Sequence, residues 1–197
     1  MRKIQVDSSC LIWWAVMVLA LPLRWILAAF TAAALHEFCH YLAIRLSGGN
    51  VQYFRITPGG AVMEAGAMTP GRELFASLAG PVGGLALLTV ARWMPLTALC
   101  GLIQSIYNLL PLYPLDGGRA LWSFARILTD EYKAERLMRY LGIGVALALS
   151  GAVVYGITTL RLGFWPLILI LPIVKEFWQE KYLAKQAFRG YNKGYHI

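Results

Sequence analysis

The stretch Ala34-Leu35-His36-Glu37-Phe38-Cys39-His40-Tyr41 places two histidines and a glutamate inside an otherwise apolar run. On a helix, residues four apart share one face and lie about 6 Å apart along the axis, so His36 and His40 can bind one metal ion. Glu37 lies about 100° around the helix from His36, close enough to activate a water molecule without being a ligand. The HExxH pattern therefore predicts a hydrolytic Zn²⁺ site on an apolar helix.

The composition predicts a membrane protein. Of the 197 residues, 58% are hydrophobic and 14% are charged, and the mean hydropathy is +0.57, which is far from the usage of soluble proteins. The net charge of +8 does not indicate nucleic-acid binding, because the basic residues lie between and after apolar runs rather than in one patch. The three cysteines lie far apart within apolar sequence, and they predict no disulfide framework.

Hydrophobic length predicts an all-α polytopic fold with about six transmembrane helices. Residues 9–47 would form a helix of about 58 Å, too long for one crossing of a hydrocarbon core of about 30 Å, and Pro22 with Arg24 marks a turn between two spans. Arg2-Lys3 before the first span is like a secretory signal, but we expect no cleavage because the apolar run continues unbroken. The predicted spans cover about residues 8–23, 25–46, 73–93, 95–110, 140–160 and 162–178.

The segments between these spans carry further predictions. Residues 51–56 and 61–64 flank a Thr-Pro-Gly-Gly turn signal, which favours a small membrane-associated β-hairpin. We expect irregular backbone over residues 115–119, after two prolines, and a solvated connection over 120–139, with a helix as one alternative for it. Residues 1–178 are expected to form a single integral-membrane domain, followed by a basic cytoplasmic tail at 179–197. Two stripes of small residues, in the third and fifth spans, would allow close helix contact: Ala76, Gly80 and Gly84, and Ala148, Ala152 and Gly156.

The distribution of basic residues predicts the orientation. Of the 18 Lys and Arg residues, only Arg24, Arg92 and Arg161 fall at the ends opposite the termini. The positive-inside rule then places both termini in the cytoplasm. His36 and His40 lie about 18 and 24 Å along a span that starts outside, so we expect the metal in the cytoplasmic half of the bilayer.

A third metal ligand is needed, because a catalytic Zn²⁺ normally takes three protein ligands and keeps one open position. Among the ten acidic residues, Glu37 and Asp116 are the two best placed near membrane depth. Asp116 is therefore the candidate, and the Gly117-Gly118 pair after it would let the backbone approach the metal closely. The alternative is that Asp116 is only a turn residue at the end of a helix.

Three motifs together resemble the site-2 protease family of intramembrane zinc metalloproteases: HEFCH at 36–40, NLLPLYPLDGG at 108–118 and AGP at 79–81. The resemblance covers about residues 35–119. It implies that His36, His40 and Asp116 ligate one Zn²⁺ per chain and that Glu37 activates the water. It also implies that Asn108 positions the substrate or its oxyanion, although Asn108 and Gln104 could instead hydrogen-bond between helices.

The resemblance also implies a branch and a function. The segment between the second and third spans is too short for a PDZ domain, which favours the short, sporulation-factor-processing-like branch. About 19 residues follow the last span, too few for the CBS domain that such relatives often carry. The implied activity is hydrolysis of a peptide bond in or near a transmembrane segment of a membrane protein, with regulatory-factor precursors as one substrate class.

The expected surroundings are a lipid bilayer, a bacterial cytoplasmic membrane and a membrane-bound regulator, with no nucleic-acid partner. A metal transporter, or a membrane protein that binds metal without hydrolysis, is the alternative from another class. A scaffold whose motif has lost activity is a third. Glu37 discriminates among them, because a transporter has little need for a non-ligating base beside the metal.

Overall fold

The computed structural model describes residues 3–57, 60–66, 68–113, 115–161, 163 and 167. Apart from residues 163 and 167, the predicted sixth span at 162–178 and the tail at 179–197 lie outside this described part. The chain divides into two compact units, Met1–Gly142 and Ile143–Ile197. All the residues predicted to form the site belong to the first unit, and the single-domain boundary at residue 178 stays a prediction.

The first two helices meet at the predicted turn. Helix α1 covers Ser8–Ala20 and helix α2 covers Leu23–Leu46, with Pro22 in extended backbone between them. The end of α2 is closed by Gly48 at φ +77°, a left-handed conformation that glycine adopts without steric cost. The amides of Gly48 and Gly49 donate to the carbonyls of Arg45 and Ile44, at 3.0 and 2.9 Å. This Schellman motif turns the chain sharply from α2 towards the sheet.

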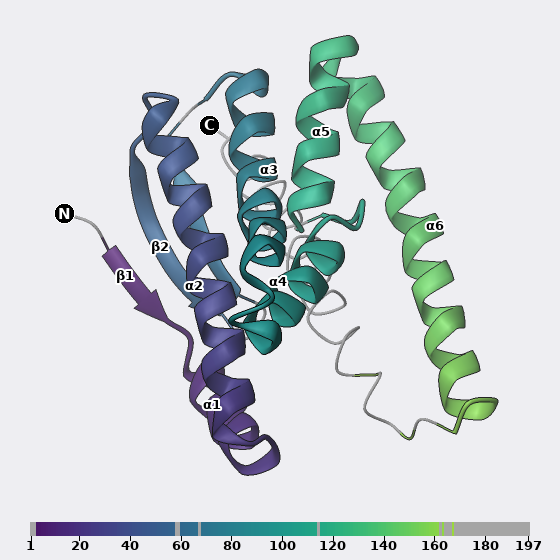
Figure 1. Cartoon of the computed structure of the whole chain (residues 1–197). Coiled ribbons are helices and arrows are strands. Elements are labelled where there is room, and N and C mark those ends of the chain that lie inside the picture. The colour runs from purple at the N-terminus through teal and green to yellow at the C-terminus, as the bar shows by residue number, and fades with distance from the viewer. Residues whose placement is uncertain are drawn as a thin grey trace, which may run out of the picture. The chain divides into compact units, whose positions relative to one another are not determined.

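A three-stranded sheet follows one side of α2 (Figure 1). Strands β2 (Val51–Thr57) and β3 (Gly60–Ala65) pair antiparallel, as the turn signal between them predicts. Strand β1 (Lys3–Val6) pairs parallel with β2, so the order is β1-β2-β3, and the predicted hairpin gains a third strand that the sequence did not indicate. The four residues of β1 are too few to show strand periodicity, and their pairing depends on a partner about 50 residues away.

The sheet is fixed to the helices by a small apolar cluster. The buried members come from α2, β2, β3 and the next helix: Ala43, Ile44, Val51, Met63 and Ala76. Their small and medium side chains exclude water at the end of α2, which contributes the stabilisation usual for buried apolar area. The sheet is therefore anchored on the helices that carry the HExxH segment and the AGP motif.

The third and fourth helices begin as their prolines predict. Helix α3 (Pro70–Ala86) continues into a 3₁₀ turn, η1 (Leu87–Val90), and α4 covers Pro95–Asn108. Both helices carry proline in their first turn, where a missing N–H costs no hydrogen bond. In Figure 1, α2 and α3 run side by side, and α4 lies against them, so that each of the three helices contacts the other two. The Ser105 hydroxyl donates to the Pro81 carbonyl at 3.0 Å, joining α4 to α3.

The region after the two prolines differs from the prediction. Helix α5 begins at Asp116 and extends to Leu128, so residues 116–119 are helical rather than irregular, and residues 120–128 form a helix with a buried face. The buried residues of α5 are small or polar, and α5 packs along α3. The physical reason is that glycine and alanine on one face permit close packing, although a Gly-Gly pair in sequence favours a turn.

Helix α6 runs without a break from Glu131 to Thr158, and it includes the charged residues that we expected to precede the fifth span. Within the described part of the chain, three stretches are long and apolar enough to cross a membrane: Leu23–Leu46, Pro70–Val90 and Glu131–Thr158. The 13 residues of α1 measure about 20 Å as a helix, which is less than the hydrocarbon thickness. The protein is thus mostly helical with apolar helices of membrane-spanning length, and the count of six crossings stays a prediction.

Candidate metal centre

Three ligand atoms from two helices converge at one point. The Nε2 atom of His36 lies 3.0 Å from Oδ2 of Asp116, and Nε2 of His40 lies 3.1 Å from the same oxygen. The two Nε2 atoms are 3.1 Å apart. His36 is 1% exposed and Asp116 is 8% exposed. This His36–His40–Asp116 group therefore places two imidazole nitrogens and a carboxylate in a buried cluster.

The geometry fits a shared cation. Zn²⁺ ligands at about 2.0–2.1 Å in tetrahedral arrangement are separated from one another by about 3.3 Å, close to the distances between these three atoms. Two imidazole nitrogens and one carboxylate oxygen are also a donor set that catalytic zinc sites use. Lone pairs and a carboxylate that meet in a buried position repel one another unless a proton or a metal cation lies between them. The residues present thus fit a metal ion of the zinc type.

The orientation of His40 is set by a hydrogen bond on the far side of its ring. Its Nδ1 atom donates to the backbone carbonyl of Ala76 in α3 at 2.7 Å. A carbonyl only accepts, so this bond keeps the proton on Nδ1 and leaves the lone pair of Nε2 directed at Asp116. Such outer partners fix the tautomer and the ring orientation of metal-binding histidines.

His36 lacks an equivalent contact. Its Nδ1 atom is buried and has no hydrogen-bond partner among the residues that the structure describes. The side-chain amide nitrogen of Asn108, at the end of α4, lies 3.4 Å from Nε2 of His36. The His36 and His40 rings meet edge to face at 78°, with centroids 4.8 Å apart. His36 is thus positioned by packing, whereas His40 is positioned by a hydrogen bond.

Glu37 and Asn108 border this group. Glu37 follows His36 directly on α2 and is half-buried, and Asn108 at the end of α4 brings its amide near Nε2 of His36. Neither contributes a ligand atom to the cluster of three. The structure therefore brings Asn108 next to the ligand atoms, and Glu37 lies in the helical turn that separates His36 from His40.

Asp116 reaches the histidines because α5 begins very close to the end of α4. A Cβ atom added to Gly117 would lie 2.1 Å from the Leu109 carbonyl oxygen, and one added to Gly118 would lie 2.3 Å from the Leu112 carbonyl carbon. These are backbone atoms, so they cannot move aside as a side chain can. The glycine pair was predicted to permit close approach to the metal; the approach that it permits is between two backbone segments.

The other end of α5 is attached to α3 by a partly buried ion pair. Nη1 of Arg126 lies 3.1 Å from Oε2 of Glu73. The same carboxylate accepts a hydrogen bond from the Ser123 hydroxyl at 3.3 Å, and the guanidinium lies over the Trp122 ring at 5.8 Å. Both side chains of the pair are about one-third exposed or less, so water screens it less than an exposed pair. We call this set the Glu73–Arg126 clamp.

The comparisons with known proteins agree with this geometry. The sequence is 27% identical over 153 residues to a zinc metalloprotease of Methanocaldococcus jannaschii, and the match covers 69% of this chain and 42% of that protein. The structure is similar to that of a site-2 protease from Methanocaldococcus jannaschii, with a TM-score of 0.63 and 20% sequence identity, over 89% of this chain and 90% of that chain. The chain has the fold of a site-2 protease. No protein-family model matches the sequence, and the chain spans less than half the length of the curated relative.

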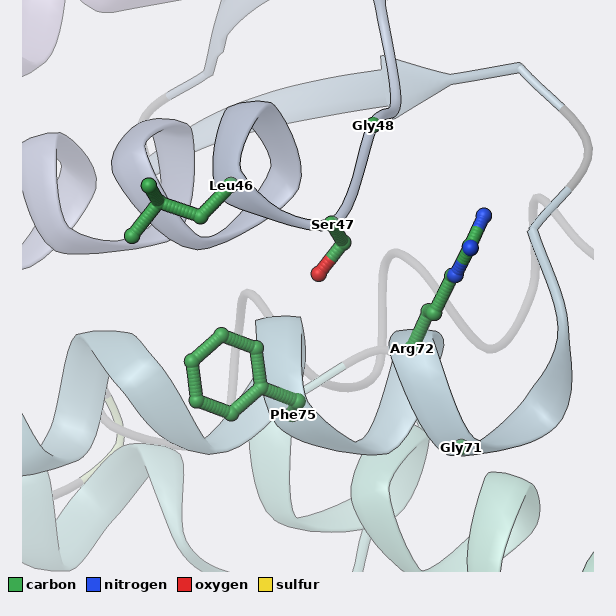
Figure 2. Close-up of a pocket in the computed structure, with 6 residues that line it drawn as sticks. All are labelled: Leu46, Ser47, Gly48, Gly71, Arg72 and Phe75. Atoms are coloured by element: carbon green, nitrogen blue, oxygen red, sulfur yellow. The ribbon is translucent and has the colours of Figure 1, made fainter.

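This chain also contains a cleft outside the metal centre. It has a volume of about 460 Å³ and lies where α2 ends and α3 begins, lined by Leu46, Ser47, Gly48, Gly71, Arg72 and Phe75. Figure 2 shows Ser47 and Phe75 facing each other across it from the two helices. Phe75 directly precedes Ala76, whose carbonyl accepts the hydrogen bond from His40. The cleft is therefore next to the metal centre along α3, but it contains no metal-ligand candidate.

The sequence did not predict one group that contacts the metal centre of this chain. The Ala76 carbonyl contacts His40, yet a backbone carbonyl has no signature in the sequence. The only sequence signal was the stripe of Ala76, Gly80 and Gly84, which predicts close helix contact without naming the partner. The structure identifies the partner as the HExxH segment of α2 at Ala76 and Gly80, and as α4 at Gly84.

Proposed function

We propose that this chain is an intramembrane zinc metalloprotease, which hydrolyses a peptide bond in or near a transmembrane segment of a membrane protein. The observation that carries this proposal is that the ligand atoms of His36, His40 and Asp116 lie 3.0–3.1 Å from one another, in a chain that also has apolar helices of membrane-spanning length. The similarity to a zinc metalloprotease in sequence, and to a site-2 protease in fold, supports the same conclusion.

His36, His40 and Asp116 would hold one Zn²⁺. When bound, this ion lowers the pKa of a coordinated water towards about 7 and polarises the scissile carbonyl. Glu37 would take the proton from the attacking water and return it to the leaving amine. A base one residue after His36 on the same helix turn can reach the reacting atoms while the two histidines stay in place.

Asn108 would orient the substrate carbonyl. Its amide nitrogen is 3.4 Å from Nε2 of His36, so a carbonyl oxygen beside the metal would lie within reach of this donor. A donor directed at the developing oxyanion stabilises the transition state more than the ground state. Replacement of Asn108 by Ala should therefore lower kcat more than it raises KM, and an unchanged kcat would remove Asn108 from the site.

Strand β3 would hold the substrate in extended form. A substrate helix must unwind before hydrolysis, because its carbonyls are occupied by helical hydrogen bonds. Among the described residues β3 is an edge strand, since β2 lies between it and β1, and an edge can accept an additional strand. Val62→Pro in β3 should slow cleavage strongly. Ile56→Pro in the neighbouring strand β2 is a second test. Undiminished cleavage by both single variants would reject this role.

The orientation and the remaining partners belong to the same proposal. Six crossings would place both termini and the metal centre on the cytoplasmic side of a bacterial cytoplasmic membrane, where a membrane-bound regulator could reach them. A cysteine at Arg161 should react with an impermeant thiol reagent added outside intact cells, and a cysteine at Arg126 should not. The reverse labelling pattern would invert the orientation.

The decisive experiment compares wild-type protein with Glu37→Gln in cells that express candidate single-span substrates. Glutamine keeps the size of the side chain but cannot accept the proton, so the cleavage product should disappear while zinc content is retained. Glu135→Gln is a matched control, because Glu135 is an exposed residue of α6 paired only with Arg139 among the described residues. Equal cleavage by wild type and Glu37→Gln would refute the proposed mechanism.

A further inference from the structure

We propose that Gly80 of α3 is a positioning residue for His40. Its missing side chain leaves the space that the imidazole needs in order to present Nε2 to the metal. The inference rests on the proposed function, in which His40 is a zinc ligand. It adds a residue from a third segment of the chain to the HExxH segment and Asp116.

The contact is direct. A Cβ atom added to Gly80 would lie 2.1 Å from Nε2 of His40, and 2.6 Å from both ring carbons bonded to that nitrogen. Such distances are far below van der Waals contact, so an added methyl group would overlap the face of the ring around Nε2. The nitrogen that would bind the metal is thus the atom most affected.

The ring has little freedom to move away. Its Nδ1 atom is bound to the Ala76 carbonyl at 2.7 Å, and Ala76 lies one turn before Gly80 on the same face of α3. The Nε2 atom must also stay near Asp116 and His36. Ala76 and Gly80 therefore position His40 together. The Ala76 carbonyl accepts a hydrogen bond from the ring, and the missing side chain of Gly80 leaves space for the ring.

Separation of α2 from α3 would not relieve the overlap easily. Three residues after Gly80, a Cβ atom at Gly83 would lie 2.3 Å from Sγ of Cys39, so the two helices are in close contact there as well. Closely packed interfaces tolerate added methyl groups poorly. The substitution Gly80→Ala should thus displace His40 and weaken zinc binding by roughly 10–100-fold, the range found when the outer partners of metal ligands are lost.

The test measures zinc affinity by competition with a chromophoric chelator on the purified full chain. Gly84→Ala is the matched control, because its added Cβ would lie 2.2 Å from Oγ of Ser105 in α4 and away from His40. Gly71→Ala is the unstrained control, since no atom of the described residues lies within 4 Å of the added carbon. We expect weakened zinc binding, and an altered visible spectrum after Co²⁺ substitution, only in Gly80→Ala.

A second measurement, without metal, covers the case in which Gly80→Ala is poorly folded. In a double-mutant cycle of apo protein, Gly80→Ala should lower the melting temperature in the wild-type background but not in His40→Ala, where the overlapping ring is gone. Equal zinc affinity in Gly80→Ala and Gly84→Ala, or additive effects in the cycle, would overturn the inference. Absence of zinc binding by the wild type would instead reject the proposed function itself.

Discussion

Helices α3 and α6 are both apolar helices with glycines, but they use these glycines differently. In α3, Cβ atoms added to Gly80 and Gly84 would lie 2.1 and 2.2 Å from side chains of neighbouring helices. In α6, Cβ atoms added to Gly144 and Gly151 would meet no atom of the described residues within 4 Å. A stripe of small residues thus shows that close contact is permitted, and only the fold shows whether a partner uses it.

The largest difference between the two regions should come from replacing the acidic residue at the start of a helix, Asp116 at α5 or Asp130 before α6. Asp116 begins α5, which packs on α3, and Asp130 directly precedes α6. Asp116→Ala should lose cleavage and weaken zinc binding by more than about 100-fold, the upper end of the range for outer partners, because a ligand itself is removed. Asp130→Ala should keep both. Zinc content by mass spectrometry checks this, and unchanged affinity in Asp116→Ala would remove it from the ligand set.

The second largest difference should come from adding a methyl group to a glycine, which should change the free energy of unfolding much more beside α3 than in α6. Gly118→Ala places a Cβ atom 2.3–2.4 Å from the backbone of Leu112 and Tyr113, which should cost about 3 kcal/mol of unfolding free energy or more. Gly144→Ala should be neutral, or stabilising by up to about 1 kcal/mol through helix propensity. Chemical unfolding in detergent measures both. Equal stabilities would show that the chain turn before α5 is looser than described.

Breaking an ion pair should produce a smaller difference in the free energy of unfolding between the two regions. Arg126→Met breaks the Glu73–Arg126 clamp, leaves a partly buried carboxylate without its cation, and should cost about 1–2 kcal/mol. Arg139→Met breaks an exposed pair on α6 and should cost less than about 0.5 kcal/mol. The same unfolding assay applies. A larger loss for Arg139 than for Arg126 would contradict the assignment of the clamp to the α3–α5 contact.

The smallest effect should be the pH dependence at the start of α6. The hydrogen bond from Lys133 lowers the pKa of Asp130 below its usual value. A carboxyl whose pKa is lower in the folded state adds stability above the unfolded pKa and loses it as pH falls through the folded one. Wild type should therefore be slightly more stable than Asp130→Asn at pH 7, with the difference fading below about pH 4. A difference that grows on acidification would reverse the assigned sign.

Sequence reasoning reached the residues of the metal centre because their chemistry is local or limited in number. The spacing of His36 and His40 defines one helix face, and few carboxylates lie at membrane depth, so Asp116 was the remaining candidate. The structure brings these three together. Their roles as ligands, and that of Glu37 as base, stay predictions to be tested.

Other features could not be read from the sequence because they depend on distant partners. Strand β1 exists through its pairing with β2, and the start of α5 at Asp116 depends on two glycines that fit against backbone. His40 is positioned by the backbone carbonyl of Ala76 and by the missing side chain of Gly80. Local propensity favoured a turn at Gly117-Gly118, and tertiary packing overrode it.

X-ray absorption at the zinc edge of the purified wild-type protein tests the central claim most directly. The His36–His40–Asp116 group predicts one zinc per chain with nitrogen and oxygen neighbours at about 2.0–2.1 Å and the outer-shell scattering of two imidazoles. That scattering should weaken in His40→Ala. A sulfur neighbour at about 2.3 Å, as Cys39 would supply, or a spectrum without imidazole scattering, would contradict this metal centre.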